Sequence, residues 1–345
     1  MTAAIFLLLT SCNSPIYNGD MDISEQQSVW QYLNVFSIYQ DRLPDNCGDR
    51  TPEELFDIIN DTLGGSRYTE YRLNKMTDNA AAYEETLEKR YVTFKIADST
   101  VYIRIPDFLD SSFLFFIDRI SFLELYENIV IDLRNNGGGS IDICDYIVSE
   151  FLPFNSGDIK FKYRAYNRKE LKGRTVDWEI QRTVNRNPKL HRKNIAVLMN
   201  RNSASASEIL ISALKDREDR PNAGAILIGD TTYGKGIGQS LLPRLGRKRL
   251  SITSIQIRGL TDRTGDYHRK GIYPDPLENE TLKTEAQYSY DPYLYYAVMS
   301  LEPSASPILV YNTIRDNLAG LPKTSSIAKK APIGAYFLLE DPLND

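Results

Sequence analysis

Three short apolar runs, each followed directly by glycines or small polar residues, constrain the fold of this chain more than any other feature. They lie at 129–133, 195–199 and 225–228. Apolar runs of this length, of which the first is broken only by Asp132, are typical of strands that are buried on both faces of a parallel sheet. Segments with helical periodicity alternate with them, at 111–126, 141–151 and 206–217. The chain is therefore expected to have an α/β fold with buried parallel strands.

Other patterns extend this core on both sides. Segments 91–96 and 100–105 flank a short polar turn and predict a β-hairpin. Thr51 and Glu54 have the spacing of a capping box at the start of a helix that Gly64 ends. The remaining expected elements are an amphipathic helix at 25–41, strands at 159–166 and 250–257, and a late helix at 290–301.

Composition excludes several classes of protein. The 345 residues carry a net charge of −5 and are 42% hydrophobic, as in an ordinary soluble globular protein rather than a dedicated polyanion binder. No apolar run reaches the roughly 18 residues that a transmembrane helix needs. The only two histidines, His191 and His268, are far apart in the sequence and have no ligand cluster beside them, so no metal site is expected. Three cysteines are too few for a disulfide scaffold, and whether Cys47 and Cys144 pair is left open.

The first residues indicate export. Seven apolar residues at 3–9 match the apolar part of a signal peptide and are too short to span a bilayer. The sequence LTSC that ends at Cys12 resembles the lipobox of a bacterial lipoprotein. This resemblance implies that 1–11 is a signal peptide, that Cys12 carries a lipid anchor at the periplasmic face of the outer membrane, and that 12–24 is a polar tether. The alternative is a short buried strand with a core cysteine, and the lack of Lys or Arg before Arg42 departs from the usual signal.

The first two apolar runs end in segments that can carry chemistry, at the strand ends where α/β proteins place their sites. The first run leads into three glycines, 137–139, which let backbone N–H groups approach a ligand. A tight turn before a helix is the alternative. The second run leads into SASASE, in which the Ser205 hydroxyl lies at a helix start, where the dipole favours negative charge. Ser205 and Glu208 also fit a capping box, which is the alternative role of this serine.

The third run leads into GDTTYGKG at 229–236, which nearly matches a phosphate-binding P-loop. Gly236 replaces the hydroxyl residue that binds magnesium, and no helix pattern follows, so a P-loop is excluded. What remains is Lys235 among glycines. A lysine has a pKa near 10.4 in water, and burial disfavours its charged form. A neutral Lys235 is able to accept the Ser205 proton, as in the Ser–Lys variant of nucleophilic catalysis.

DLRNNGGG at 132–139, SASASE at 203–208 and TYGKGIGQ at 232–239, in this order, resemble the C-terminal processing (tail-specific) serine peptidases. Asp275 ends a Pro-Asp step that follows in many members. The resemblance implies an α/β fold with a crotonase-like (ClpP-like) peptidase core, which cleaves polypeptides through an acyl-enzyme without metal or cofactor. The implied divisions of the chain are a helical segment at 25–90, the core at 91–290, and a C-terminal helix and tail at 291–345.

The resemblance also assigns site residues by position. The implied nucleophile is Ser205, the base is Lys235, and Gln239 orients the lysine amine. The implied oxyanion donors are the N–H groups of Gly138 and Ala206. Asp216 falls where some members have an aspartate of importance, and a carboxylate on a helix surface is the alternative for it. Many members hold the substrate C-terminus with a PDZ domain, and no such domain is evident at 25–90, which leaves substrate selection open.

Two other functions are weighed. Segment 160–193 holds twelve Lys or Arg residues with aromatic residues between them, a pattern of single-stranded nucleic-acid binding. An exported, acidic chain argues against nucleic acid, and a solvated surface or an anionic contact is the alternative. The second is a non-catalytic lipoprotein of the same fold that binds peptides or other ligands. The joint presence of Ser205, Lys235 and Gln239 favours a peptidase, while the oligomeric state is left open.

Overall fold

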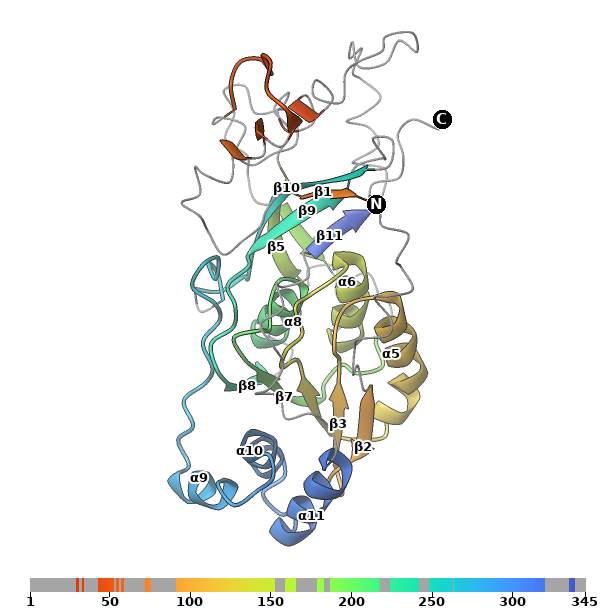
Figure 1. Ribbon diagram of the computed structural model, residues 1–345. Helices are drawn as coiled ribbons and strands as arrows, with labels where there is room; N and C mark the ends of the chain where they lie inside the picture. Colours follow the sequence, from red (N-terminus) through yellow and green to blue (C-terminus); the bar gives the residue numbers. More distant parts are fainter. Residues whose placement is uncertain are drawn as a thin grey trace.

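The computed structural model describes most of the chain from residue 91 to residue 319 and shorter parts outside it (Figure 1). The described residues are 29–30, 33, 43–52, 54–55, 57–58, 72–75, 91–152, 159–165, 179–182, 187–217, 224–241, 248–262, 264–319 and 335–338. The predicted signal peptide, Cys12, the tether and Gly64 lie outside them and stay predictions. Near the N-terminus, the predicted capping box is confirmed: Thr51 N–H donates to Glu54 Oε2 (2.7 Å), and Glu54 N–H donates to Thr51 Oγ1 (3.2 Å).

A five-stranded sheet carries the predicted parallel core. Its first two strands form the predicted antiparallel hairpin, and the other neighbours pair in parallel. The strand order is β2 (Val92–Lys95), β3 (Thr100–Arg104), β4 (Asn128–Asp132), β7 (Asn194–Met199) and β8 (Ile226–Gly229). The prediction of a mixed α/β fold with buried parallel strands is confirmed.

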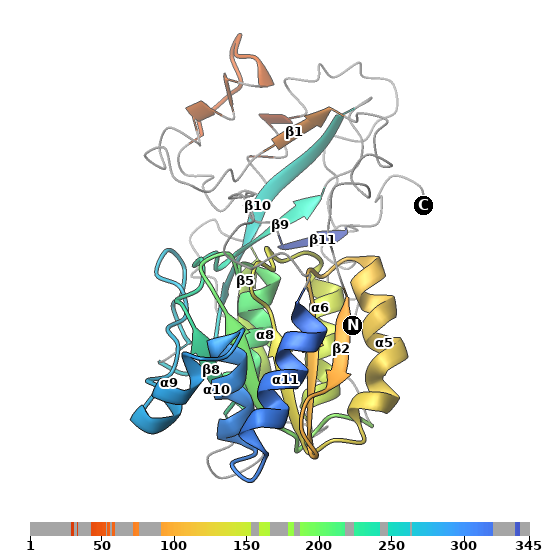
Figure 2. The ribbon, with the colours of Figure 1, turned by 60° about the horizontal axis from the view of Figure 1, so that its bottom comes forward.

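Helices cover both faces of this sheet (Figure 2). One face packs against the three helices that follow β3, β4 and β7, namely α5 (Asp110–Leu123), α6 (Ile141–Phe151) and α8 (Ala206–Lys215). The other face packs against α9 (Glu280–Ala286), α10 (Pro292–Leu301) and α11 (Pro307–Leu318). The predicted late helix is α10, whereas α9 and α11 were not predicted.

The side chains of the central strands explain why successive positions within them are apolar. Ile129 and Ile131 of β4 pack on the α5–α6–α8 side, while Val130 between them packs on the α10 side. Because successive side chains of a strand point to opposite faces, a strand with helices on both sides needs apolar residues at every position.

A six-stranded sheet lies beside this core (Figure 1). Its main path is β11 (Ala335–Leu338), β9 (Ile237–Leu241), β10 (Lys248–Arg258), β5 (Ile159–Ala165) and β6 (Glu179–Arg182), and β1 (Arg72–Lys75) also pairs with β10. The pairing of β11 with β9 is parallel and the other pairings are antiparallel. Strands β5 and β10 were predicted, whereas β1, β6, β9 and β11 were not.

Two further features of the described residues concern a membrane-spanning helix and a disulfide. None of their helices combines the length and apolarity that a bilayer crossing needs. Cys47 and Cys144 are not joined by a disulfide.

Candidate active site

The segments that follow β4, β7 and β8 meet at one edge of the five-stranded sheet. The N–H of Ala204 donates to the carbonyl oxygen of Asn136 (3.0 Å), and the Ser207 hydroxyl donates to the same oxygen (2.8 Å). The N–H of Tyr233 donates to the carbonyl oxygen of Ser203 (2.9 Å). The three segments that the sequence singled out are therefore held together by direct hydrogen bonds.

Ser205 has an unusual backbone conformation at the start of α8. Its φ is +63° and its ψ is −116°, and its side chain is almost completely buried. Its N–H donates to Glu208 Oε2 (2.9 Å), and the predicted capping box of Ser205 and Glu208 is present. A helix N-cap residue ordinarily has an extended backbone, and a left-handed one is costly for serine. Capping alone therefore does not account for the conformation of Ser205.

Glu208 joins the serine segment to the lysine segment. Its Oε2 also accepts the N–H of Lys235 (2.7 Å), so the backbones of Ser205 and Lys235 bind the same oxygen atom. Its Oε1 accepts the Gly234 N–H (2.6 Å) and the Thr232 hydroxyl (2.6 Å). Burial raises the pKa of Glu208, and these hydrogen bonds oppose that rise. In the sequence, Glu208 is recognisable only as a capping residue, since no local pattern shows donors that lie 24 to 27 residues further along the chain.

Lys235 is held in a loop that docks closely on the segment before the Pro-Asp step. Gly234 has φ +83°, and its carbonyl oxygen accepts the Arg269 N–H (2.7 Å). A Cβ atom on Gly234 would lie 2.7 Å from the Gly271 nitrogen, so only glycine fits there. Lys235 is 5% exposed. Gln239, four residues later on β9, is 7% exposed.

The two residues implied as oxyanion donors differ in the hydrogen bonding of their backbone N–H groups. Ala206 is the first residue of α8, where backbone N–H groups have no partner within the helix. The Gly138 N–H donates to the Asn136 side-chain oxygen (2.9 Å), and the Asn136 amide group in turn donates to the Ile105 carbonyl (2.9 Å). Gly138 is therefore part of a closed turn, and donation to a substrate requires that Asn136 release it.

A buried charge network lies directly before the glycine segment. Arg134 makes two side-chain bonds to Asp132 (2.9 and 2.6 Å) and two to Asp291 (3.0 and 2.7 Å). The Tyr102 hydroxyl also donates to Asp132 (2.7 Å). Burial would raise the pKa of Asp132, but the Arg134 guanidinium outweighs it and holds this pKa below its usual value. Sequence reasoning missed the role of Asp291, which lies 157 residues after Arg134.

Two acidic residues that the sequence singled out anchor other segments. Asp216, at the end of α8, is buried rather than on the helix surface, so the alternative expected for it is wrong. It accepts the Leu260 N–H (2.8 Å) and the hydroxyls of Thr261 (2.7 Å) and Thr264. Asp275, of the Pro-Asp step, accepts the Lys215 ammonium group (2.9 Å) and the Leu227 N–H (2.7 Å). Both carboxylates tie a loop to the core.

The structure brings one histidine closer to the lysine loop than the sequence suggested. A Cβ atom on Gly236 would lie 3.1 Å from the His268 Cβ. Burial, followed by the positive charges of Arg269 and Lys235, lowers the pKa of His268 to about 4. His268 is therefore neutral at the pH where most peptidases work. No group of three or more His, Cys, Asp or Glu side chains in the described part of the chain is arranged to hold a metal ion.

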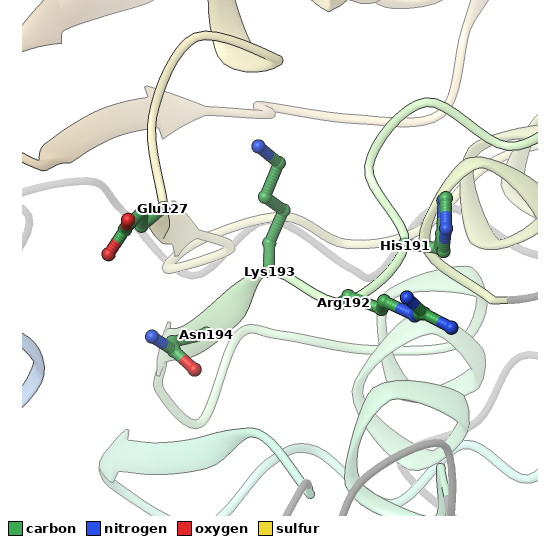
Figure 3. Close-up of a pocket in the computed structure, with 5 residues that line it drawn as sticks. All are labelled: Glu127, His191, Arg192, Lys193 and Asn194. Carbon is green, nitrogen blue, oxygen red and sulfur yellow. The ribbon is translucent and has the colours of Figure 1, made fainter.

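A pocket of about 340 Å³ lies away from these segments (Figure 3). The residues around it directly precede β4 or lie just before and at the first position of β7, whereas the candidate site follows the same strands. Lys193, one of them, donates to the carbonyl oxygen of Glu124 (2.7 Å). The lining residues are Glu127, His191, Arg192, Lys193 and Asn194. The pocket thus lies at the opposite end of the sheet from Ser205.

Comparisons with known sequences cover this region. The family model for peptidase family S41 matches residues 99–277. A carboxyl-terminal-processing protease of Synechocystis sp. is 29% identical over 191 residues, which are 55% of this chain and 40% of that protein. A probable CtpA-like serine protease of Staphylococcus saprophyticus is 30% identical over 147 residues, 43% of this chain and 26% of that protein. This chain spans less than half the length of either relative.

Solved structures share the fold. A candidate S41 protease from Bacteroides fragilis aligns with a TM-score of 0.51 at 14% identity, over 90% of this chain and 100% of that one. A lipoprotein from Streptococcus agalactiae aligns with a TM-score of 0.52 at 18% identity, over 72% of this chain and 89% of that one. At such identities the likeness concerns the fold alone.

Proposed function

This chain belongs to peptidase family S41, and from that membership we propose that it is a serine endopeptidase of the C-terminal processing type. Its substrates are polypeptides, exported or unfolded, and its reacting groups are Ser205 and Lys235. The observation that carries the proposal is the shared contact on Glu208, where one carboxylate oxygen binds the backbone N–H of both residues. The backbones of two residues 30 positions apart in the sequence thus share one carboxylate oxygen, which supports Ser205 and Lys235 as reacting partners.

The proposed reaction begins with attack of Ser205 Oγ on the carbonyl carbon of the substrate. The hydroxyl proton passes to the neutral amine of Lys235, and Gln239 orients that amine. The negative oxygen of the tetrahedral intermediate accepts the Ala206 N–H at the helix start and the Gly138 N–H once Asn136 releases it. Collapse breaks the C–N bond, and Lys235 returns the proton to the leaving amine. Water then cleaves the ester, again with Lys235 as base, and restores Ser205.

The variant Lys235→Arg tests whether Lys235 acts as the base in this mechanism. Guanidinium stays protonated and cannot accept a proton, so we expect Lys235→Arg to be as inactive as Lys235→Ala and Ser205→Ala. Cleavage of an unfolded reporter is followed by mass spectrometry from pH 6 to 10. The wild-type rate is expected to rise with pH along one ionisation. An active arginine variant would overturn the Ser–Lys assignment.

The same experiment addresses the alternative of a non-catalytic peptide-binding protein of this fold. The left-handed Ser205 backbone and the shared Glu208 contact support a reacting serine, because a binding protein has no need of either. If wild type and Ser205→Ala both leave the reporter intact while binding it, the non-catalytic alternative replaces the peptidase.

We also propose that Cys12 carries the lipid that anchors the protein in the cell envelope. The support is the sequence LTSC after seven apolar residues. A polypeptide-cleaving domain on a polar tether at a membrane surface fits substrates that are themselves exported.

A further inference from the structure

The chain's own C-terminal segment lies beside the strand that leads away from Lys235. Strand β9 starts two residues after Lys235 and contains Gln239. One edge of β9 pairs with β10, and the other pairs in parallel with β11, the strand formed by 335–338 (Figures 1 and 2). In the parallel register, Ala335 is opposite Gly238 and Tyr336 is opposite Gln239.

We propose that this edge of β9 is the subsite for the substrate residues that follow the scissile bond, and that β11 is its intramolecular occupant. The inference rests on the proposed peptidase function and adds how an extended polypeptide is held. Pairing of an extended peptide with a sheet edge is a recurring mode of recognition in which backbone hydrogen bonds supply the affinity.

The direction of the pairing decides which side of the scissile bond is bound. Residue numbers rise together along β9 and β11, from Gly238 and Ala335 to Leu241 and Leu338. Lys235 precedes Gly238 by three residues, a distance of about 10 Å along an extended chain. A peptide that pairs as β11 does therefore has its earlier residues nearer to Lys235 and its later residues farther from it. The edge accordingly binds the part of the substrate that is released, its C-terminal tail.

The composition of the two strands defines the class of ligand. The occupant has the sequence Ala-Tyr-Phe-Leu, which is apolar and uncharged. On β9, Gly238 packs so closely on α6 that a Cβ atom would lie 3.3 Å from Ile141 Cδ1. β11 also lies against α6. An extended, uncharged and apolar tail is thus the ligand that fits, with α6 beneath it.

A tethered occupant lowers the apparent affinity for a second peptide, since only molecules with a vacant edge can bind it. Proline has no backbone N–H, and alternate residues of a strand direct their N–H groups to the same neighbour. One of the two variants Tyr336→Pro and Phe337→Pro must therefore remove a bond to β9. Tyr336→Ala and Phe337→Ala keep the N–H groups and are the matched controls.

The test measures binding of a fluorescent peptide that ends in Ala-Tyr-Phe-Leu, by anisotropy, in a Ser205→Ala background that cannot cleave it. We expect at least one proline variant to bind about tenfold more tightly than its alanine control, and a peptide with N-methylated amides to bind no variant. Equal affinities in all four variants, with the far-ultraviolet circular dichroism unchanged, would overturn the proposal. Equal binding of the N-methylated peptide would overturn it as well.

A chain that ends at residue 334 is the second variant, in case proline disturbs the sheet. It is expected to bind the peptide more tightly than the full chain, and with the catalytic serine present to cleave reporters with apolar tails at a lower KM and a similar kcat. Unchanged binding would contradict the proposal. Because binding is read without turnover, loss of all cleavage in the wild type would instead count against the peptidase function.

Discussion

At the scale of single residues, a substitution of Glu208 can distinguish a role in positioning Ser205 and Lys235 from a role in the stability of the fold. Glutamine has one acceptor oxygen and one amide donor group, so Glu208→Gln would set an N–H donor against at least one of the backbone N–H groups that the carboxylate accepts. Misplacement of reacting groups by about 1 Å can cost about 100-fold in rate, and we expect kcat to fall by at least that factor with little change in KM. Steady-state kinetics on the unfolded reporter measure both constants.

A matched control for this substitution exists elsewhere in the core. Glu302 is also a buried carboxylate, and it accepts the Ser99 N–H and the Thr100 hydroxyl (2.6 Å), far from Ser205. Glu302→Gln is expected to lower the free energy of unfolding by about 1–3 kcal/mol without lowering kcat. If both variants lose only stability, Glu208 has no positioning role.

His268 makes the stability of the protein depend on acid. Its pKa is about 4 in the folded protein because of burial, Arg269 and Lys235, with Asp266 acting in the opposite direction. An unfolded imidazole titrates near 6.5. Between these values the unfolded chain binds more protons, so the contribution to stability is full above about pH 6.5 and is lost as pH falls towards 4. His268→Gln is expected to flatten this slope in urea unfolding at pH 5 and pH 7. An unchanged slope would show that His268 is not the titrating group.

At the scale of elements, Asp291 couples the start of α10 to the segment before the glycines. Its side chain caps α10 by accepting the Leu294 N–H (3.1 Å), and the same carboxylate also binds the Arg134 guanidinium. Asparagine caps helices as well as aspartate does but carries no charge. We expect Asp291→Asn to keep α10 and to lower kcat/KM several-fold, because Arg134 loses one of its two carboxylates.

Asn279→Ala is the control for the effect of capping alone. Asn279 caps α9 by accepting the Leu282 N–H (2.9 Å). Its loss is expected to cost about 0.5–2 kcal/mol of stability and no activity. Circular dichroism and kcat/KM, measured on both variants, distinguish the two roles, and equal activity of Asp291→Asn and wild type would refute the coupling.

At the centre of the sheet, the sequence predicted β4 and β7 because nearly all of their residues are buried. β4 and β7 are covered on both faces, so their apolar runs could be read without knowledge of the fold. The sequence did not predict β9, because the glycine at position 238 is typical of a loop. In the structure, Gly238 lies in a strand and packs closely against Ile141. Ser205 and Lys235 stood out by local motif, whereas the contacts of Glu208 and Asp291 join segments far apart in the chain. Such contacts follow from topology and leave no local pattern.

At the scale of the whole molecule, the region that matches the family model ends before the helices that complete the hydrophobic core. The match covers 99–277, yet the helices that bury Val130, Ala196 and Leu198 on the second face of the sheet all begin after residue 279. The matched region alone would therefore expose an apolar sheet face to water. The C-terminal helices and β11 belong to the same folded unit as the candidate site, which is why a change in the tail can reach substrate binding.

A lipid on Cys12 would attach this folded unit to a membrane. If Cys12 is the lipidated residue, the mature protein begins there, and the tether at 12–24 allows the first helix to lie up to about 40 Å from the membrane surface. One acyl chain gives only marginal membrane binding, so stable anchoring requires that Cys12 carry more than one. We expect the mature N-terminal peptide to show that added mass, and the intact protein to partition into detergent. Cys12→Ala should move the protein to the soluble fraction while Cys47→Ala, the control, does not. Recovery of an intact Met1 from the native host would refute the anchor and leave the peptidase assignment untouched.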